Sequence, residues 1–210
     1  HQDKDDKYLI EKHTILTAPS IQVLSLSQTN KQSAKKPNAP VLPRGESALI
    51  VGNPTMSKAG VGEKLEPLEQ LPGAEQEAKK IAQMLITKPI IGDEATESTI
   101  VQKMASAELI HLATHGLLDD TNAIGSPGAI ALTPDDKNND SLLAPDDKND
   151  GFLTTSEIME NFGLSGKQKL QADLVVLSAC DTGRGDIKGE GVIGLSRAFM
   201  ASGVPTLVVS

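Results

Sequence analysis

The stretch that decides the fold is "ADLVVLSACDTGRGDIKGEGVIGLSRAFMASGVPTLVVS", residues 172–210. It opens with a short apolar run and passes through a glycine-rich loop. It then enters "GVIGLSRAFMASG", where Val192, Leu195 and Phe199 share one helical face. A second apolar run, "TLVVS", follows. The order predicts a strand, a helix and another strand, which is the unit from which parallel sheets are built.

The same alternation runs through the preceding residues. Apolar runs at 47–54, 88–95 and 107–116 predict strands, and amphipathic segments at 71–85, 96–107 and 154–163 predict helices. The helix at 71–85 carries an apolar stripe of Ala78, Ile81, Ala82 and Leu85. Thr96 or Ser98 is expected to cap the second helix. The pattern indicates an α/β fold with a mostly parallel sheet flanked by helices.

The chain is interpreted as one domain with a peripheral beginning. Residues 1–26 are expected to form a short strand or strand pair and then a helix, and residues 27–46, which are polar and proline-rich, a flexible loop. Residues 47–210 would form the core. Because the last apolar run stops at Ser210 as if in mid-strand, we expect the chain to be a piece of a longer protein, truncated at its C-terminus.

Composition excludes several classes of protein. There are 20 basic and 28 acidic residues, and no basic patch is visible, so nucleic acid is an unexpected partner. The single cysteine excludes an intrachain disulfide and fits a reducing compartment. No apolar run approaches the roughly 20 residues that span a membrane. A cytoplasmic protein that does not bind membranes is therefore expected.

Much of the acidity lies between Asp119 and Asp150, which hold eight aspartates and two lysines. This segment contains a near duplication, "TPDDKNNDSLL" followed by "APDDKNDGFL". Each copy begins with a proline motif and is rich in Asp and Asn. We interpret residues near 119–150 as a flexible surface insertion.

Two candidate catalytic side chains stand at predicted strand ends. His115 ends one strand and Cys180 ends another, and the carboxyl ends of parallel strands collect at one edge of a sheet. A thiol attacks as the thiolate, and a neutral imidazole can take its proton and later protonate a leaving amine. Gly116, directly after His115, would let a substrate carbonyl approach and offer an N–H to an oxyanion. The alternative is that Cys180 is a buried structural thiol.

Other motifs compete with this interpretation. "GEGVIG" at 189–194 fits G-x-G-x-x-G, but it does not directly follow its strand and no acidic residue follows about 20 positions later. "DDKNDGFLTTSE" at 146–157 nearly fits a calcium loop, but Lys148 occupies a ligand position. We interpret it instead as a turn in which Thr154, Thr155 or Ser156 caps the next helix. His111 is expected to be a packed or hydrogen-bonded core residue, and "RGD" at 184–186 a chance match.

The blocks "LIHLATHG" and "LVVLSACDTGRGDIKGEGVIGLSRAFMASGVPTLVVS" resemble the His and Cys blocks of the CHAT domain, a caspase-like domain often attached to tetratricopeptide repeats. "LPGAEQEAKKIAQML", "DGFLTTSEI" and "YLIEKHTILTAPSIQVL" resemble its other blocks. The resemblance implies a caspase–hemoglobinase-like three-layer fold and a cysteine endopeptidase with a His115 and Cys180 dyad. It implies no cofactor and no metal. Cys180 follows His115 by 65 positions, which exceeds the roughly 50 of caspases.

The resemblance also shapes the expected partners. The oxyanion would lie against the N–H groups of Gly116 and Cys180, and a polypeptide would be the substrate. Ser178, Asp181 and Glu190 are candidates for substrate binding, because carboxylates near the pocket would favour Lys or Arg before the cut bond. Helical repeats are expected elsewhere in a larger, bacterial protein. The alternative function is an inactive caspase-shaped scaffold for protein interaction.

Overall fold

The computed structural model describes Ser25 and residues 43–56, 58–61, 64–117, 128–136, 149–163, 166, 168–179 and 189–210. The backbone alone is described for residues 58–61 and 64–67 and for parts of the first turns of the last helix. The strand and helix predicted within residues 1–26 therefore lie outside the described residues, Ser25 excepted. In the described parts of the chain, no helix combines the length and apolar character needed to cross a membrane.

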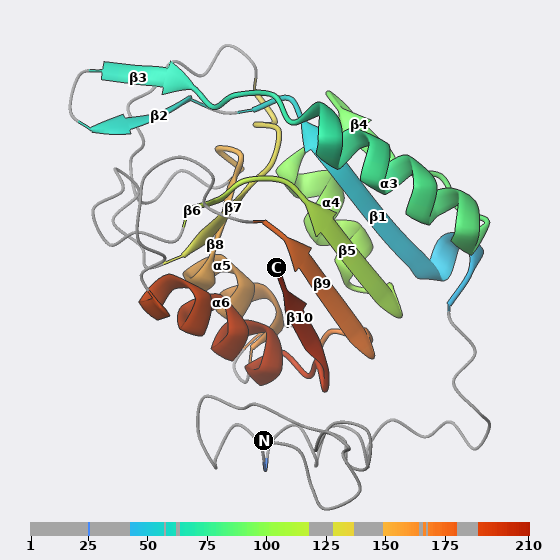
Figure 1. The fold of residues 1–210 in the computed structure, drawn as a ribbon. Coiled ribbons are helices and arrows are strands. Elements are labelled where there is room, and N and C mark those ends of the chain that lie inside the picture. The colour runs from blue at the N-terminus through green and yellow to red at the C-terminus, as the bar shows by residue number, and fades with distance from the viewer. Residues whose placement is uncertain are drawn as a thin grey trace, which may run out of the picture.

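The centre of the fold is a five-stranded parallel sheet (Figure 1). Its strand order is β10-β9-β5-β1-β4. β1 lies next to the edge strand β4, which follows it in the sheet, and the later strands β5, β9 and β10 continue on the other side of β1. The predicted α/β class, with a mostly parallel sheet, is confirmed. The strands are β1 (Ala48–Pro54), β4 (Ile90–Gly92), β5 (Leu109–Ala113), β9 (Leu174–Ser178) and β10 (Leu207–Val209).

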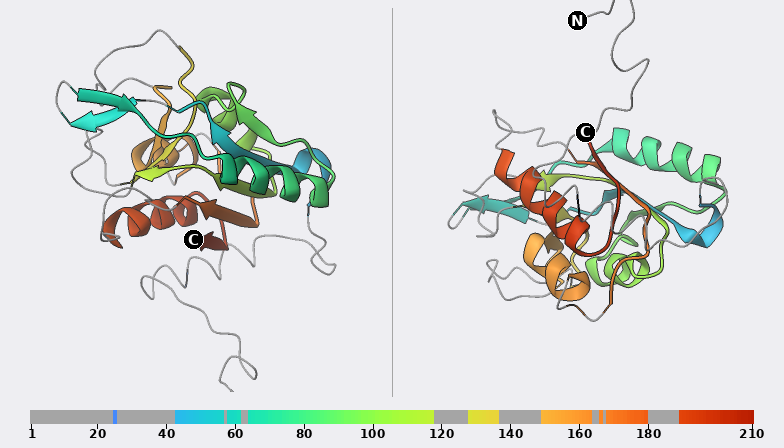
Figure 2. Two further views of the ribbon diagram at one scale, coloured as in Figure 1. Left: turned by 45° about the horizontal axis from the view of Figure 1, so that its top comes forward. Right: turned by 90° about the horizontal axis from the view of Figure 1, so that it is seen from below.

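Helix α3 (Pro72–Leu85) lies against one face of this sheet, over β1 and β5 (Figure 2). Gly52 of β1 makes the approach possible, because a Cβ there would lie 2.4 Å from the Cβ of Ala78 and 2.7 Å from the carbonyl oxygen of Ala74. The predicted apolar stripe is confirmed as the buried side of the helix. Its contacts form a small apolar cluster of Ala48, Ile50, Ala78, Ala82, Leu85 and Leu109, with Ile81 and Leu174 packed beside it.

The opposite face carries a larger core beneath α4 (Glu97–Met104), α5 (Thr155–Phe162) and α6 (Gly189–Ala201). Helices on both faces give three layers, as expected for a caspase-like fold (Figure 2). The core is mostly aliphatic, and all three phenylalanines of the sequence are buried. Leu195 and Phe199 of α6 point into it together with Ile110 and Leu112 of β5 and Val175 and Leu177 of β9.

The helix starts follow the predicted caps. Thr96 is the N-cap of α4 and its side chain accepts a hydrogen bond from the N–H of Thr99. Thr154 is the N-cap of α5, where it forms a reciprocal capping box with Glu157. Each was one of the candidates named for its helix. The segment 146–157, which nearly fits a calcium loop, therefore contains a helix cap, as interpreted from the sequence.

A second, antiparallel sheet is absent from the sequence prediction. It contains β6 (Gly116–Leu117), β7 (Ala129–Ala131) and β8 (Phe152–Thr154). The interpretation of 119–150 as a surface insertion is wrong for Ala129–Ala131, which is fully buried. Ala129 and Ala131 pack with Met56 and Phe152, and Ile130 packs into the larger core. A hairpin of β2 (Lys58–Val61) and β3 (Lys64–Pro67) and a 3-10 turn, η1 (Gly45–Ser47), were also not predicted.

Candidate active site

The carboxyl ends of β5 and β9 lie next to each other. The two strands pair in parallel, with Ala113 opposite Ser178, and the N–H of Thr114 donates to the carbonyl of Ser178 at 3.2 Å. His115 follows this last contact on β5. The strand ends from which the sequence paired His115 with Cys180 are therefore neighbours in one sheet. β5 lies beside β1, and the strand order changes direction between these two strands, which is where ligands bind in open parallel sheets.

The imidazole of His115 has a defined partner. Its Nε2 lies 2.8 Å from the main-chain carbonyl oxygen of Glu69. A carbonyl oxygen only accepts hydrogen bonds, so this contact requires the proton on Nε2. The neutral ring then keeps its lone pair on Nδ1, which is the atom left to act as a base.

Gly116 lies against the residue that precedes Cys180. A Cβ at Gly116 would be 2.6 Å from the carbonyl oxygen of Ala179, closer than real Cβ atoms approach. The missing side chain therefore allows β6 to pass directly beside the chain leaving β9. This gives Gly116 a packing reason in addition to the predicted role in substrate approach.

The other predicted site residues are described unequally. Cys180 and Asp181 lie outside the described residues. Glu190 lies in α6, which begins at Gly189, and nothing is described of its side chain. The "GEGVIG" motif therefore falls in the first turns of this helix.

Ser178 takes part in a polar bridge that the sequence did not predict. Its hydroxyl donates to Oε2 of Glu77 at 3.2 Å, and Oε1 of the same carboxylate lies 2.9 Å from Nε2 of His111. His111 is buried, as expected, with 5% of its surface exposed. Burial lowers the pKa of His111, and the nearby Glu77 carboxylate only partly opposes this effect. The ring is therefore neutral at pH 7, with its Nε2 proton directed to Glu77.

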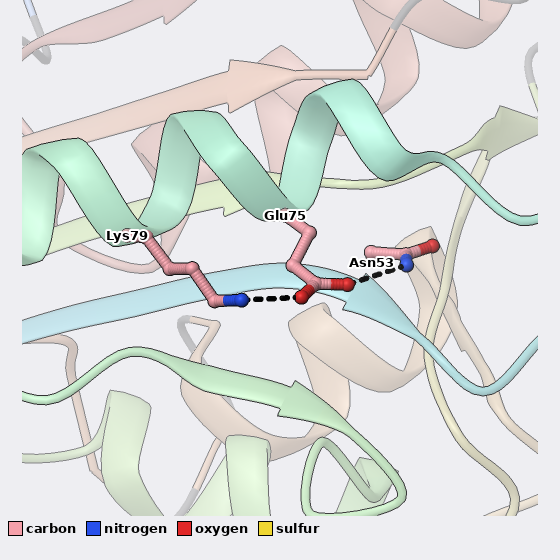
Figure 3. A network of polar contacts seen from close by, with 3 residues as sticks. All are labelled: Asn53, Glu75 and Lys79. Carbon is pink, nitrogen blue, oxygen red and sulfur yellow. Dashed lines mark hydrogen bonds and ion pairs between the residues drawn. The ribbon is translucent and has the colours of Figure 1, made fainter.

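Asn53 fixes the chain where α3 begins (Figure 3). It follows β1 residue Gly52 with a left-handed φ of 47°, a conformation that Asn tolerates better than most residues. Its Oδ1 accepts from the N–H of Leu71 at 2.6 Å, and its Nδ2 donates to Glu75 at 3.3 Å. Hydrogen bonds from Lys79 and then Asn53 lower the pKa of Glu75. Asn53 thus holds the segment that presents the Glu69 carbonyl to His115.

No group of three or more His, Cys, Asp or Glu side chains suited to a metal ion occurs among the residues that the structure describes. The two histidines of "HLATH" do not converge on one point. Their Nε2 atoms face different partners, the Glu77 carboxylate for His111 and the Glu69 carbonyl for His115.

The sequence profile named CHAT domain matches residues 1–210. The chain belongs to the CHAT domain family. Two curated relatives are tetratricopeptide repeat protein 28 from Homo sapiens, 28% identical over 226 residues, and its Mus musculus counterpart, 25% identical over 225 residues. Each alignment covers 98% of this chain and 9% of the relative.

Membership confirms the resemblance stated from the sequence, and the names of both relatives agree with the expected association of CHAT domains with tetratricopeptide repeats. Both relatives are mammalian, so they do not support the expected bacterial origin. The chain spans about a tenth of their length.

Proposed function

We propose that this CHAT domain is a cysteine endopeptidase of caspase-like type with a His115 and Cys180 dyad. The observation that carries the proposal is the placement of His115. It follows β5 at the carboxyl edge of the sheet, beside the end of β9 that leads into Cys180, and its Nε2 is engaged by a main-chain carbonyl. Nδ1 remains as the base, in a family whose fold is that of cysteine peptidases.

The proposed reaction begins when the His115 imidazole takes the proton of the Cys180 thiol. The thiolate attacks the carbonyl carbon of a peptide bond, and the oxyanion is held by the N–H groups of Gly116 and Cys180. The C–N bond then breaks, and His115 gives its proton to the leaving amine. Water, deprotonated by His115, hydrolyses the acyl-enzyme and releases the carboxylic acid. This sequence requires no cofactor.

The proposed substrate is a polypeptide cut after Lys or Arg. Ser178 lies at the end of β9, and the carboxylates of Asp181 and Glu190 lie close to Cys180 in the sequence. Peptides ending in Arg or Lys should be cleaved faster than those ending in Asp or Leu. Equal rates would contradict the preference without touching the dyad. We further propose a cytoplasmic protein with helical repeats outside this chain, and neither nucleic acid nor membrane as a partner.

Labelling by a peptide acyloxymethyl ketone tests the function in the intact protein. The wild type should gain one adduct on Cys180, identified by peptide mass spectrometry. Cys180→Ala should lose it, and His115→Ala should slow it by roughly a hundredfold or more, the usual contribution of a general base. A folded wild type without a Cys180-dependent adduct would favour the alternative, an inactive caspase-shaped scaffold.

A further inference from the structure

The carboxylate of Glu77 joins one helix to two neighbouring strands. Glu77 lies on α3, its Oε1 meets His111 on β5, and its Oε2 meets Ser178 on β9. His111 is paired with Val176, so Ser178 lies two residues further along β9 than the partner of His111. The bridge therefore crosses the seam between β5 and β9 obliquely, close to the carboxyl ends of both strands.

Both residues of the proposed dyad follow closely in the sequence after residues of this bridge. His115 follows His111 by four residues, and Cys180 follows Ser178 by two. A shift of either strand relative to the other at the bridge would therefore be passed to the spacing of the two reacting groups. Small displacements are costly to catalysis because the reacting atoms must lie within a narrow range of distances.

The remainder of α3 does not depend on Glu77 for its place. The helix is held by its apolar cluster and by the direct contact of Ala74 and Ala78 with Gly52. The Glu77 side chain is 38% exposed, so its truncation opens no cavity in the core. Loss of the carboxylate would leave the helix docked and would release the polar contacts across the seam.

We propose that Glu77 is a positioning residue of the His115 and Cys180 dyad, which it sets by linking His111 and Ser178 across the β5–β9 seam. The inference rests on the proposed peptidase function and adds to it a residue that touches neither substrate nor thiol. Its role is geometric: one side chain must reach both strands at once.

Two substitutions of Glu77 distinguish the length of its side chain from its charge. In Glu77→Gln the amide oxygen can accept from His111 and the amide nitrogen can donate to Ser178, so the bridge survives without its charge. In Glu77→Asp the charge survives, but the side chain is one methylene too short for both contacts. A positioning role predicts that Gln restores the rate and that Asp does not.

The test is the rate of Cys180 labelling by a peptide acyloxymethyl ketone in the intact protein, resolved into kinact and KI. Glu77→Ala and Glu77→Asp should lower kinact by roughly tenfold to a hundredfold, with KI and the melting temperature little changed. Glu77→Gln should stay within about threefold of wild type. Gln76→Ala, at the exposed neighbouring position on α3, is the matched control and should behave as wild type.

Wild-type kinact in Glu77→Ala would overturn the inference while leaving the peptidase in place. A rate that follows charge, with Asp active and Gln slow, would overturn it equally, because it would indicate an electrostatic role. A wild type that is not labelled at Cys180 would remove the proposed peptidase function itself, and the positioning role with it.

Discussion

The two faces of the central sheet differ in what they carry. Under α4, α5 and α6 the strands present an unbroken apolar surface, including Ile110 and Leu112 of β5 and Val175 and Leu177 of β9. Under α3 the same two strands contribute Leu109 and Leu174 to the apolar cluster near their amino ends. Toward the carboxyl ends of this face come His111 and Ser178, both bonded to Glu77.

The difference indicates that the face under α4, α5 and α6 mainly serves stability, whereas the face under α3 serves the proposed chemistry. Alternate residues of a strand point to opposite faces, so one strand can bury an apolar row on one side and carry polar groups on the other. The larger core buries more apolar side chains than the cluster under α3. The α3 face can therefore hold a buried imidazole and a serine that contribute little to the free energy of folding. Substitutions on the two faces should therefore affect different measurements.

The largest expected effect on the free energy of unfolding comes from a substitution on the core side, the face of the sheet covered by α4, α5 and α6. Phe199→Ala removes a fully buried ring from α6 and should lower the free energy of unfolding by about 3–5 kcal/mol, since the space it leaves is only partly refilled. Met84→Ala, at a position 76% exposed on α3, should change it by less than about 0.5 kcal/mol. Urea denaturation measures both. If Phe199→Ala lowered the free energy of unfolding by less than about 1 kcal/mol, the proposed assignment of stability to this face would be contradicted.

Much of the core side could be predicted from the sequence, because its signals are local. Helical periodicity located α3, and the apolar runs located β1, β5 and β9. Cap chemistry gave Thr96 and Thr154, since a Thr at a helix start bonds to an N–H only three residues away. The sheet of β6, β7 and β8 gave no such signal, because its strands have only two or three residues.

The polar bridge of the α3 face could not be predicted for a different reason. Glu77 is separated by 34 residues from His111 and by 101 from Ser178. On the sequence it is one of several polar residues on an amphipathic helix, and only the packing of α3 on the sheet selects it. Asn53 is similar, although a polar residue between Gly52 and Pro54 at a strand end is a weak signal of a turn.

One carboxylate is buried on the otherwise mostly apolar core side. Glu97, at the start of α4, is only 2% exposed and accepts a hydrogen bond from the N–H of Gly151 at 2.9 Å. Burial, and then the nearby charge of Glu157, raises the pKa of Glu97 to about 8. The folded protein therefore keeps this proton at neutral pH, whereas the unfolded chain loses it near the ordinary value of 4.5.

The stabilisation from protonated Glu97 is complete below pH 4.5 and is lost as pH rises toward 8. From pH 5.5 to 8 the loss should amount to about 3 kcal/mol. Glu97→Gln keeps an acceptor for Gly151 and cannot ionise, so its stability relative to wild type should rise by that amount over the same window. Thermal unfolding across pH measures the difference, with Glu94→Gln at an exposed position as control. A pH-independent difference would show that Glu97 does not retain its proton.

The smallest expected change in stability comes from a substitution where β6 passes beside the chain leaving β9. Gly116→Ala places a Cβ 2.6 Å from the Ala179 carbonyl, so β6 and the chain leaving β9 must move apart. Such overpacking should cost about 1–3 kcal/mol. Gly73→Ala is the matched control, because a Cβ there meets nothing within 4 Å, and it should be neutral or slightly stabilising.

Labelling of Cys180 should respond to Gly116→Ala more strongly than the melting temperature does. If the strand ends form the site, their separation moves the reacting groups apart even where the fold survives. The core variant Phe199→Ala should show the reverse pattern at temperatures where it remains folded, with a large loss of stability and a nearly unchanged labelling rate. Equal ratios of rate loss to stability loss in the two variants would mean that the two faces of the sheet are not separable in function.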